Sequence, residues 1–310
     1  MTVYQQISNN KWKTTALMTV FIALIVALGY FGGYFIGGDS SYAISGVFYA
    51  TIVSIVMTLV SYFAGDSLSL AASGARQIKK EDSPYIWNMV ENLTIAVGLP
   101  MPRIFIIDDP VMNAFATGRD PQHASIALTT GLINGLENEE LEAVIGHELS
   151  HIQNYDIRVM TIVVVLVGVI ALLSDWMLRM TLFGRRNSDS DNKDIRLQLI
   201  FMAIGLVFII LSPIAAQLIQ LAISRKREYL ADASSVLMTR YADGLIRALQ
   251  KIQQQESAGM QMRQANHATA HLFFANPFKK TKFVSRLFST HPPIEDRINA
   301  LRSAGGQSAQ

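Results

Sequence analysis

Two histidines and a glutamate stand at a spacing that suits a catalytic metal site. The segment from Glu137 to Asn154 has apolar residues at helical spacing and an acidic first turn, which predicts a helix. His147 and His151 are four residues apart, so both imidazoles leave one face of that helix. Glu148 follows the first histidine. This His-Glu-x-x-His arrangement predicts two Zn²⁺ ligands and a glutamate that acts as general base on zinc-bound water.

The alternative for this motif is a pair of solvated histidines on a surface helix. Apolar residues surround the motif, and a polar cluster buried among them is costly unless it binds something. The metal-binding interpretation is therefore favoured.

A catalytic zinc site needs a third protein ligand and an open position for water. The chain has no cysteine, so the third ligand must be a histidine or a carboxylate. Glu228 and Asp232 are four residues apart and directly follow a long uncharged run. If a hairpin returns them to the histidines, Glu228 becomes the third ligand and Asp232 binds the far ring nitrogen of a zinc histidine. The alternative for this pair is a surface salt bridge with Arg225 or Lys226.

Long uncharged runs indicate a membrane protein. The mean hydropathy is +0.28, and 16 % of the residues are charged, against about a quarter in ordinary soluble domains. About 20 apolar residues span a bilayer, and the first two runs meet that length and predict a hairpin that stays in the membrane. The third run only barely meets it, so a buried soluble hairpin is the alternative for the last two runs. The runs are residues 14–38, 40–65, 159–174 and 197–224.

These runs predict four parts of the chain. Residues 1–65 form a transmembrane hairpin, and residues 159–224 form a second one. Residues 66–158 begin a catalytic domain and contain the His-Glu-x-x-His helix, and residues 225–310 complete it with the third ligand. The first of these two segments has six Lys/Arg against thirteen Asp/Glu, and the second has thirteen against six. Their opposite charges predict that they pack together as one domain.

The distribution of basic residues predicts the orientation in the membrane. Basic clusters precede the first run and follow the second and fourth runs, which places the catalytic domain in the cytoplasm. The loop of residues 179–196 disagrees, because it has five basic against three acidic residues and lies outside in this topology. The formal net charge of +2 gives no reason to expect nucleic acid as a partner.

Several motifs together resemble a known family. The sequence resembles the membrane zinc endopeptidases of the HtpX type, relatives of the type I CAAX prenyl proteases, and the resemblance covers almost the whole chain. The matching motifs are His147-Glu-Leu-Ser-His151, Glu228-Tyr-Leu-Ala-Asp232, Asn113-Ala-Phe-Ala-Thr-Gly118, Asn154-Tyr-Asp156 and Thr290-His-Pro-Pro-Ile-Glu-Asp-Arg-Ile298.

This resemblance implies an α-helical membrane protein with four transmembrane helices and an α+β, zincin-like (gluzincin) catalytic domain. It implies one Zn²⁺ per chain, held by His147, His151 and Glu228, with Glu148 as the base. It also assigns His291 and Arg297 to the oxyanion that forms during peptide hydrolysis. The role of Asp156 stays open between orienting the zinc site and capping the next helix.

Two short runs predict strands that could bind substrate. Residues 103–107 and 124–128 are rich in β-forming residues. An extended peptide commonly pairs with an exposed strand of a zinc peptidase. We therefore expect the second run to be that exposed edge, with residues 113–115, between the two runs, nearby. The expected substrate-binding residues are Asn113, Ala114, Phe115, Ala124, Ser125 and Ile126.

The resemblance further implies a role in stress response and protein quality control at the cell inner membrane. The expected substrates are misfolded or damaged membrane proteins, with membrane lipid as the surroundings. A prenyl-protein-processing peptidase and a non-catalytic zinc-binding membrane scaffold are the alternatives. His123, His267 and His271 match no motif and are expected at the surface or in linkers.

Overall fold

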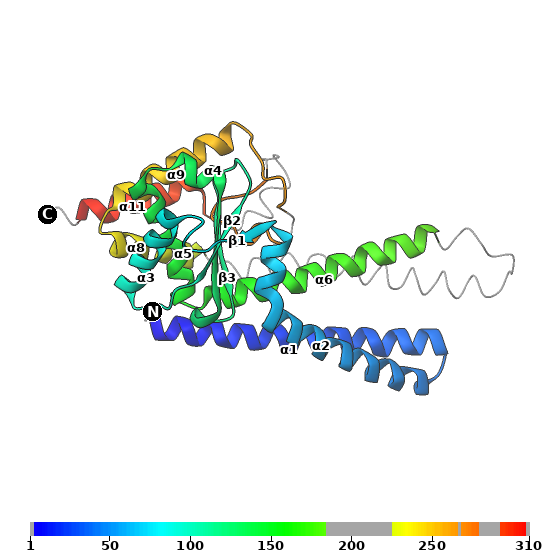
Figure 1. Cartoon of the computed structure of the whole chain (residues 1–310). Coiled ribbons are helices and arrows are strands. Elements are labelled where there is room, and N and C mark those ends of the chain that lie inside the picture. Colours follow the sequence, from blue (N-terminus) through cyan, green and yellow to red (C-terminus); the bar gives the residue numbers. More distant parts are fainter. Residues whose placement is uncertain (1–2, 184–224, 266–267, 279–291, 308–310) are drawn as a thin grey trace.

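Long helices and one small sheet make up the described part of the chain. The computed structural model describes residues 3–183, 225–265, 268–278 and 292–307 (Figure 1). The first helices are α1 (Val3–Gly37), α2 (Ser40–Ala72), α3 (Pro84–Val97), α4 (Thr130–Gly135), α5 (Asn138–Gln153) and α6 (Asp156–Phe183). The later ones are α8 (Arg225–Thr239), α9 (Ala242–Ser257) and α11 (Ile294–Gln307), with the short 3₁₀ helices η1 (Pro121–His123) and η3 (Ala270–Leu272). The strands are β1 (Ala75–Gln77), β2 (Arg103–Ile107), β3 (Ala114–Gly118) and β4 (Ala124–Thr129).

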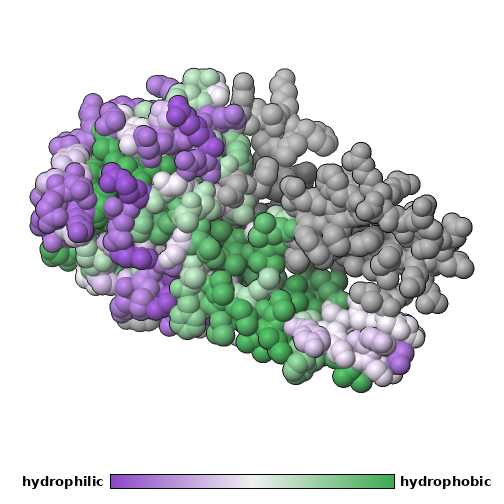
Figure 2. Space-filling view, turned by 45° about the vertical axis from the view of Figure 1, so that its right-hand side comes forward, coloured by the Kyte–Doolittle hydropathy of each residue, from purple (hydrophilic) through white to green (hydrophobic). Residues whose placement is uncertain are grey.

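The first two helices form the predicted hairpin. Both are long and apolar enough to cross a membrane, and only a small share of their residues is buried inside the protein. Figure 2 shows apolar surface gathered along the lower middle of the molecule, on the side of these helices, and mainly polar surface at the left-hand end. The two helices approach closely because glycines face each other: a Cβ on Gly46 would lie 2.1 Å from the carbonyl oxygen of Gly29. Helix α2 continues to Ala72, past the predicted boundary at residue 65.

The third predicted run lies in α6, which projects in the same direction as the hairpin (Figure 1). Its first turns are buried against α1, where Leu17 and Phe21 pack with Val163 and Leu166. Helices α5 and α6 meet at an angle of 83°, and this bent pair is long and apolar enough to count as one further span. The fourth predicted run, residues 197–224, lies outside the described residues.

Four strands form a mixed sheet in the order β1-β2-β4-β3. The strands β2 and β4 are parallel, and each outer strand is antiparallel to its neighbour. The central strand β4 has all six of its residues buried. The prediction that residues 124–128 form the exposed edge is therefore wrong, and β3 is an edge strand instead.

The sheet lies between two groups of helices. On one face, Ile104 and Ile126 belong to a core shared with residues of α3, α5 and α9. On the other face, Phe105 and Ala127 pack in a core with Leu70 of α2 and with residues of α6. Because both faces are covered, all residues of β4 are buried instead of alternating between buried and exposed positions. Helices α2 and α6 thus pack directly on the sheet. The sheet and the helices α3, α4, α5, α8, α9 and α11 are called the catalytic part below.

Ion pairs join the acidic and basic halves of the catalytic part. The buried Glu140 of α5 accepts hydrogen bonds from Lys251 Nζ at 2.7 Å and from Arg247 Nε at 3.3 Å, both on α9. Burial raises the pKa of Glu140, but these bonds and the amide of Glu137 outweigh it and lower the pKa below its ordinary value. The charge complementarity read from the sequence is realised at this contact.

Candidate metal centre

Helix α5 presents the two histidines of the motif on one buried face. It begins after Glu137, which forms a capping box with Glu140, so the acidic first turn fixes the start of the helix. The rings of His147 and His151 lie edge to face, and their Nε2 atoms are 3.1 Å apart. The spacing of four residues has therefore brought both imidazoles to one point, as predicted.

A sharp break after α5 places the next side chain against the second histidine. Tyr155 has a φ of +60°, which ends the helix and turns the chain by 83° into α6. This left-handed conformation is uncommon for a residue other than glycine. The turn returns Asp156, the first residue of α6, to a distance of 3.0 Å between its Oδ2 and His151 Nδ1. Asp156 thus both begins the next helix and orients a histidine.

Helix α8 brings the third potential ligand. Gly146 of α5 leaves room for Ser235 of α8, since a Cβ there would lie 3.1 Å from the serine Oγ. The Oε1 of Glu228 is 3.5 Å from His151 Nε2, and its Oε2 is 3.8 Å from His147 Nε2. Glu228 is buried, so the alternative of a surface salt bridge does not apply.

Asp232 and Arg297 hold the first histidine from behind. Asp232 Oδ1 lies 2.9 Å from His147 Nδ1, and the guanidinium of Arg297 binds both carboxylate oxygens at 2.6 and 2.9 Å. Burial raises the pKa of Asp232, but the Arg297 charge and bonds outweigh it and lower the pKa to about 2. Asp232 is therefore ionised, and its carboxylate accepts a hydrogen bond from the Nδ1–H group of His147.

These donors fit a metal ion. One ligand atom from each of His147, His151 and Glu228 lies within 4.8 Å of the others, and all three residues are buried. The Nδ1 atom of each histidine faces a carboxylate, which leaves the two Nε2 atoms beside Glu228. Three protein ligands with an open fourth position are typical of catalytic metal sites.

The electrostatics of the cluster differ between its members. Burial lowers the pKa of His147 to about 4, so this imidazole is neutral. Burial also lowers the pKa of His151, but the bond to Asp156 and the charge of Glu228 outweigh it and raise the pKa to about 9. Burial raises the pKa of Glu148 to about 7. A carboxyl group with a pKa near neutrality can both accept and return a proton.

Glu148 also contacts the edge strand. The backbone amide of Ala116 in β3 donates a hydrogen bond to its carboxylate. The neighbouring Ala114 turns its carbonyl oxygen out of the sheet, where the amide of Phe274 binds it at 2.8 Å. The outward edge of β3 therefore runs beside the proposed base.

The predicted substrate-binding residues divide into two groups. Ala114 and Phe115 lie on the edge strand β3, whereas Ala124, Ser125 and Ile126 lie on the central strand β4 and are buried. Asn113 is buried and clamps the chain at Ala275, with its Oδ1 and Nδ2 bound to the amide and carbonyl of that residue. The strands were expected, but their order in the sheet depends on contacts that a local pattern does not contain.

Of the two residues expected at the oxyanion, the structure describes Arg297 alone. His291 lies outside the described residues. Arg297 is buried behind His147, on the Nδ1 side of the ring and away from Nε2, with both oxygens of Asp232 as its partners. Its Nη2 lies 3.4 Å from His147 Nδ1, and its role at the oxyanion stays a prediction.

Sequence reasoning missed several residues around the cluster. The ring of Phe274 packs edge to face on His147 at 4.9 Å, under the guanidinium of Arg297 at 4.4 Å. His271 was expected at the surface or in a linker, but it is buried, with its Nε2 3.1 Å from the carbonyl oxygen of Met160. Arg227 binds Asp156 Oδ1 at 2.8 Å. For Arg227, its place beside Glu228 was the only available signal.

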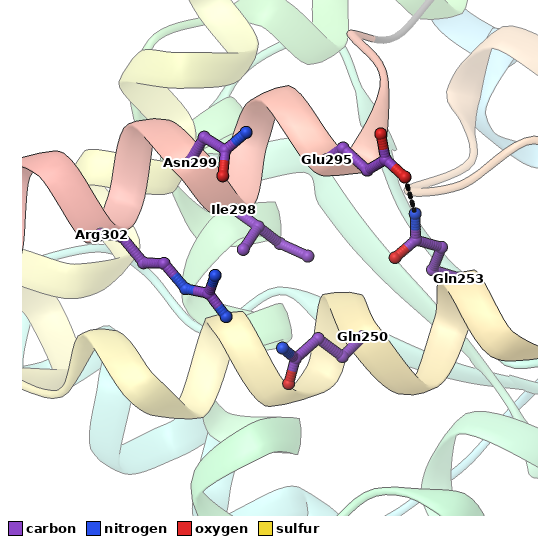
Figure 3. A pocket seen from close by; sticks show the side chains of 6 residues that line it. All are labelled: Gln250, Gln253, Glu295, Ile298, Asn299 and Arg302. Carbon is purple, nitrogen blue, oxygen red and sulfur yellow. Dashed lines mark hydrogen bonds between the residues drawn. The ribbon is translucent and has the colours of Figure 1, made fainter.

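A separate groove lies between α9 and α11 and has a volume of about 270 Å³ (Figure 3). Glu295 and Gln253 meet across it through a hydrogen bond of 3.2 Å. None of the candidate site residues lines it, so the groove is distinct from the metal centre. Its lining residues are Gln250, Gln253, Glu295, Ile298, Asn299 and Arg302.

The described residues combine two helices of membrane-spanning length with a buried His-His-Glu cluster whose donors suit a metal ion. Residues 80–304 match the model of peptidase family M48. The chain belongs to this family.

Its relatives agree with this assignment. It is 43 % identical to the "Protease HtpX homolog" of Tropheryma whipplei (strain TW08/27) over 305 residues, which covers 98 % of this chain and 99 % of the relative. It is 44 % identical to the protein of the same name from Lactobacillus acidophilus over 302 residues, covering 96 % and 99 %. Among solved structures it is similar to S. mikatae Ste24p, with 21 % identity and a TM-score of 0.47 over 96 % of this chain and 67 % of that chain.

Proposed function

We propose that this chain is a zinc-dependent endopeptidase of the membrane with a gluzincin-like site. The observation that carries the proposal is the buried His147–His151–Glu228 cluster with Glu148 beside it. The composition of this donor set, two imidazoles and one carboxylate, matches that of catalytic zinc sites in peptidases.

In this proposal His147, His151 and Glu228 hold one Zn²⁺. Zinc bound there polarises the peptide carbonyl and makes water a nucleophile at neutral pH. Glu148 takes the proton of the attacking water and delivers it to the leaving amine nitrogen. In the metal-free protein, burial raises the pKa of this carboxyl group to about 7. Asp232 and Asp156 keep the imidazoles in the tautomer that has its lone pair on Nε2.

Substrate binding is assigned to the edge strand β3. Ala114 and Ala116 turn backbone groups outward beside Glu148, and an extended peptide that adds to this edge would take the place of the Phe274 amide on the Ala114 carbonyl. His291, from the His-Pro-Pro segment, stays a candidate for the oxyanion. Ala114 and Phe115 stay candidates for substrate contact on β3.

The preferred substrates are unfolded or damaged membrane proteins. Helices α2 and α6 pack directly on the sheet that carries β3, so the site lies next to the bilayer. Polypeptide loops that leave the membrane unfolded are therefore the segments that reach it first. We place the protein in a bacterial inner membrane with its catalytic part in the cytoplasm, in line with the positive-inside rule.

Cleavage of casein by the detergent-purified full chain tests this function. Zinc-loaded wild type is compared with Glu148→Gln, a near-isosteric change that keeps all three ligands. We expect cleavage by wild type, a loss of about 10²- to 10⁴-fold in the variant, and equal zinc content in both. Zinc binding without cleavage in either protein would favour a non-catalytic scaffold, and equal cleavage by both would remove Glu148 from the mechanism.

A further inference from the structure

A side chain of the membrane hairpin reaches the metal centre. Asn10 of α1 is buried, and its amide nitrogen donates to Asp156 Oδ1 at 2.8 Å and to the carbonyl oxygen of Asn154 at 2.9 Å. Its own oxygen lies 3.4 Å from Arg227 Nη1, within hydrogen-bond distance. All three hydrogen-bonding functions of this carboxamide are thus engaged around a single carboxylate.

That carboxylate orients a proposed zinc ligand. Asp156 Oδ1 accepts hydrogen bonds from Asn10 Nδ2 and Arg227 Nη1. Asp156 Oδ2 accepts a hydrogen bond from His151 Nδ1 at 3.0 Å. A carboxylate bound from both ends has one available orientation, and this orientation fixes the imidazole. Groups that hold such a carboxylate influence metal affinity without touching the metal.

The length of α1 explains how a membrane helix reaches this point. Its 35 residues extend about 52 Å at 1.5 Å per residue, whereas the hydrocarbon core is roughly 30 Å thick. The first turns therefore project beyond the core and lie beneath the catalytic part, beside the start of α6 (Figure 1). The match to the peptidase family begins at residue 80, so Asn10 lies outside it.

A purely structural role would be to fasten α1 to α6. Apolar contacts already serve that purpose, since Leu17 and Phe21 of α1 are buried with Val163 and Leu166 of α6. Burying a carboxamide costs free energy unless it is hydrogen-bonded, and the partners of Asn10 are Asp156, Asn154 and Arg227, which lie around the metal centre. The two roles can be separated, because Leu17 contacts α6 without joining the polar network.

We propose that Asn10 is a positioning residue of the metal centre, through which the membrane hairpin holds Asp156 and thereby His151. This inference rests on the proposed zinc site, and its primary readout is metal affinity. The prediction is that the hairpin is part of the site as well as its anchor.

The test uses the full-length chain in detergent, stripped of metal and titrated with zinc against a chromophoric chelator. Asn10→Leu keeps a similar volume but removes the hydrogen bonds, and Asn10→Asp keeps the shape but replaces the donors with a carboxylate. Leu17→Ala is the control for weaker docking of α1. We expect both Asn10 variants to lose about tenfold in zinc affinity, with lower kcat and unchanged KM for casein at saturating zinc.

The control separates positioning from docking. We expect Leu17→Ala to lower the melting temperature and to leave the zinc dissociation constant unchanged. Wild-type zinc affinity in both Asn10 variants, or an equal loss in Leu17→Ala, would overturn the inference. Failure of the endopeptidase proposal appears differently, as absence of cleavage by zinc-loaded wild type, and leaves the affinity comparison readable.

Discussion

Asp232 has two partners, His147 and Arg297, and all three side chains are almost inaccessible to solvent. The arginine neutralises the carboxylate, and the carboxylate orients the imidazole. Breaking a buried ion pair by removing one partner leaves an uncompensated charge. The structure therefore gives Arg297 a different expected phenotype from the oxyanion role that the family resemblance implied.

Replacing Arg297 with leucine should reduce both stability and metal binding. We expect a loss of about 3–5 kcal/mol in the free energy of unfolding, because Asp232 keeps only His147 as a partner. The melting temperature in detergent and the zinc dissociation constant measure the two effects. Arg302→Leu, an exposed change on the same helix, is the control. A variant with normal stability and zinc affinity but low kcat would favour the oxyanion role instead.

Zinc affinity should depend on pH through one histidine. His151, with a pKa of about 9 in the metal-free protein, must lose its second proton to bind a metal, whereas His147, with a pKa of about 4, is already neutral. Below pH 9 the proton competes with the metal, so apparent affinity should rise with pH, about tenfold per unit. Chelator competition between pH 6 and pH 8 measures this slope. A zinc affinity that does not change with pH, or one that rises about a hundredfold per pH unit, would contradict the competition of a single proton on His151.

At the scale of elements, the sequence predicted the helices that carry ligands better than the sheet. The acidic first turn and the apolar spacing predicted the motif helix within a residue of α5. The strand at residues 103–107 was also predicted correctly. The order of the strands was not, because an apolar run does not reveal which strands flank it. His271 was misjudged for the same reason, since only the packing of η3 against α6 buries it.

Proline substitutions distinguish the central strand from the edge strand. Ile126→Pro removes a ladder hydrogen bond in β4, which pairs on both sides, and should prevent the sheet from forming normally. Ala116→Pro removes an amide that points away from β4 toward Glu148, so the sheet should survive while cleavage falls about tenfold or more. Circular dichroism, gel filtration and casein cleavage report the outcomes. A folded, active Ile126→Pro protein would refute the central position of β4.

At the scale of the whole molecule, the membrane helices and the catalytic part share their cores. Residues of α2 and α6 form one hydrophobic cluster with β2, β3 and β4, and α1 closes a second cluster against α6. The hydrogen bonds of Asn10 continue this contact into the metal centre. Opening of the site and movement of the hairpin should therefore be linked, because no flexible linker separates them in the described residues.

The orientation in the membrane can be tested on a chain that has no cysteine of its own. Ser40→Cys introduces an exposed thiol at the start of α2, between the two spans, and Glu81→Cys introduces one before α3 on the catalytic part. If the catalytic part is cytoplasmic, a membrane-impermeant maleimide should label Ser40→Cys in intact spheroplasts. It should label Glu81→Cys only after permeabilisation. The reverse pattern would place the metal centre outside the cytoplasm, and labelling of neither thiol before permeabilisation would exclude a spanning hairpin.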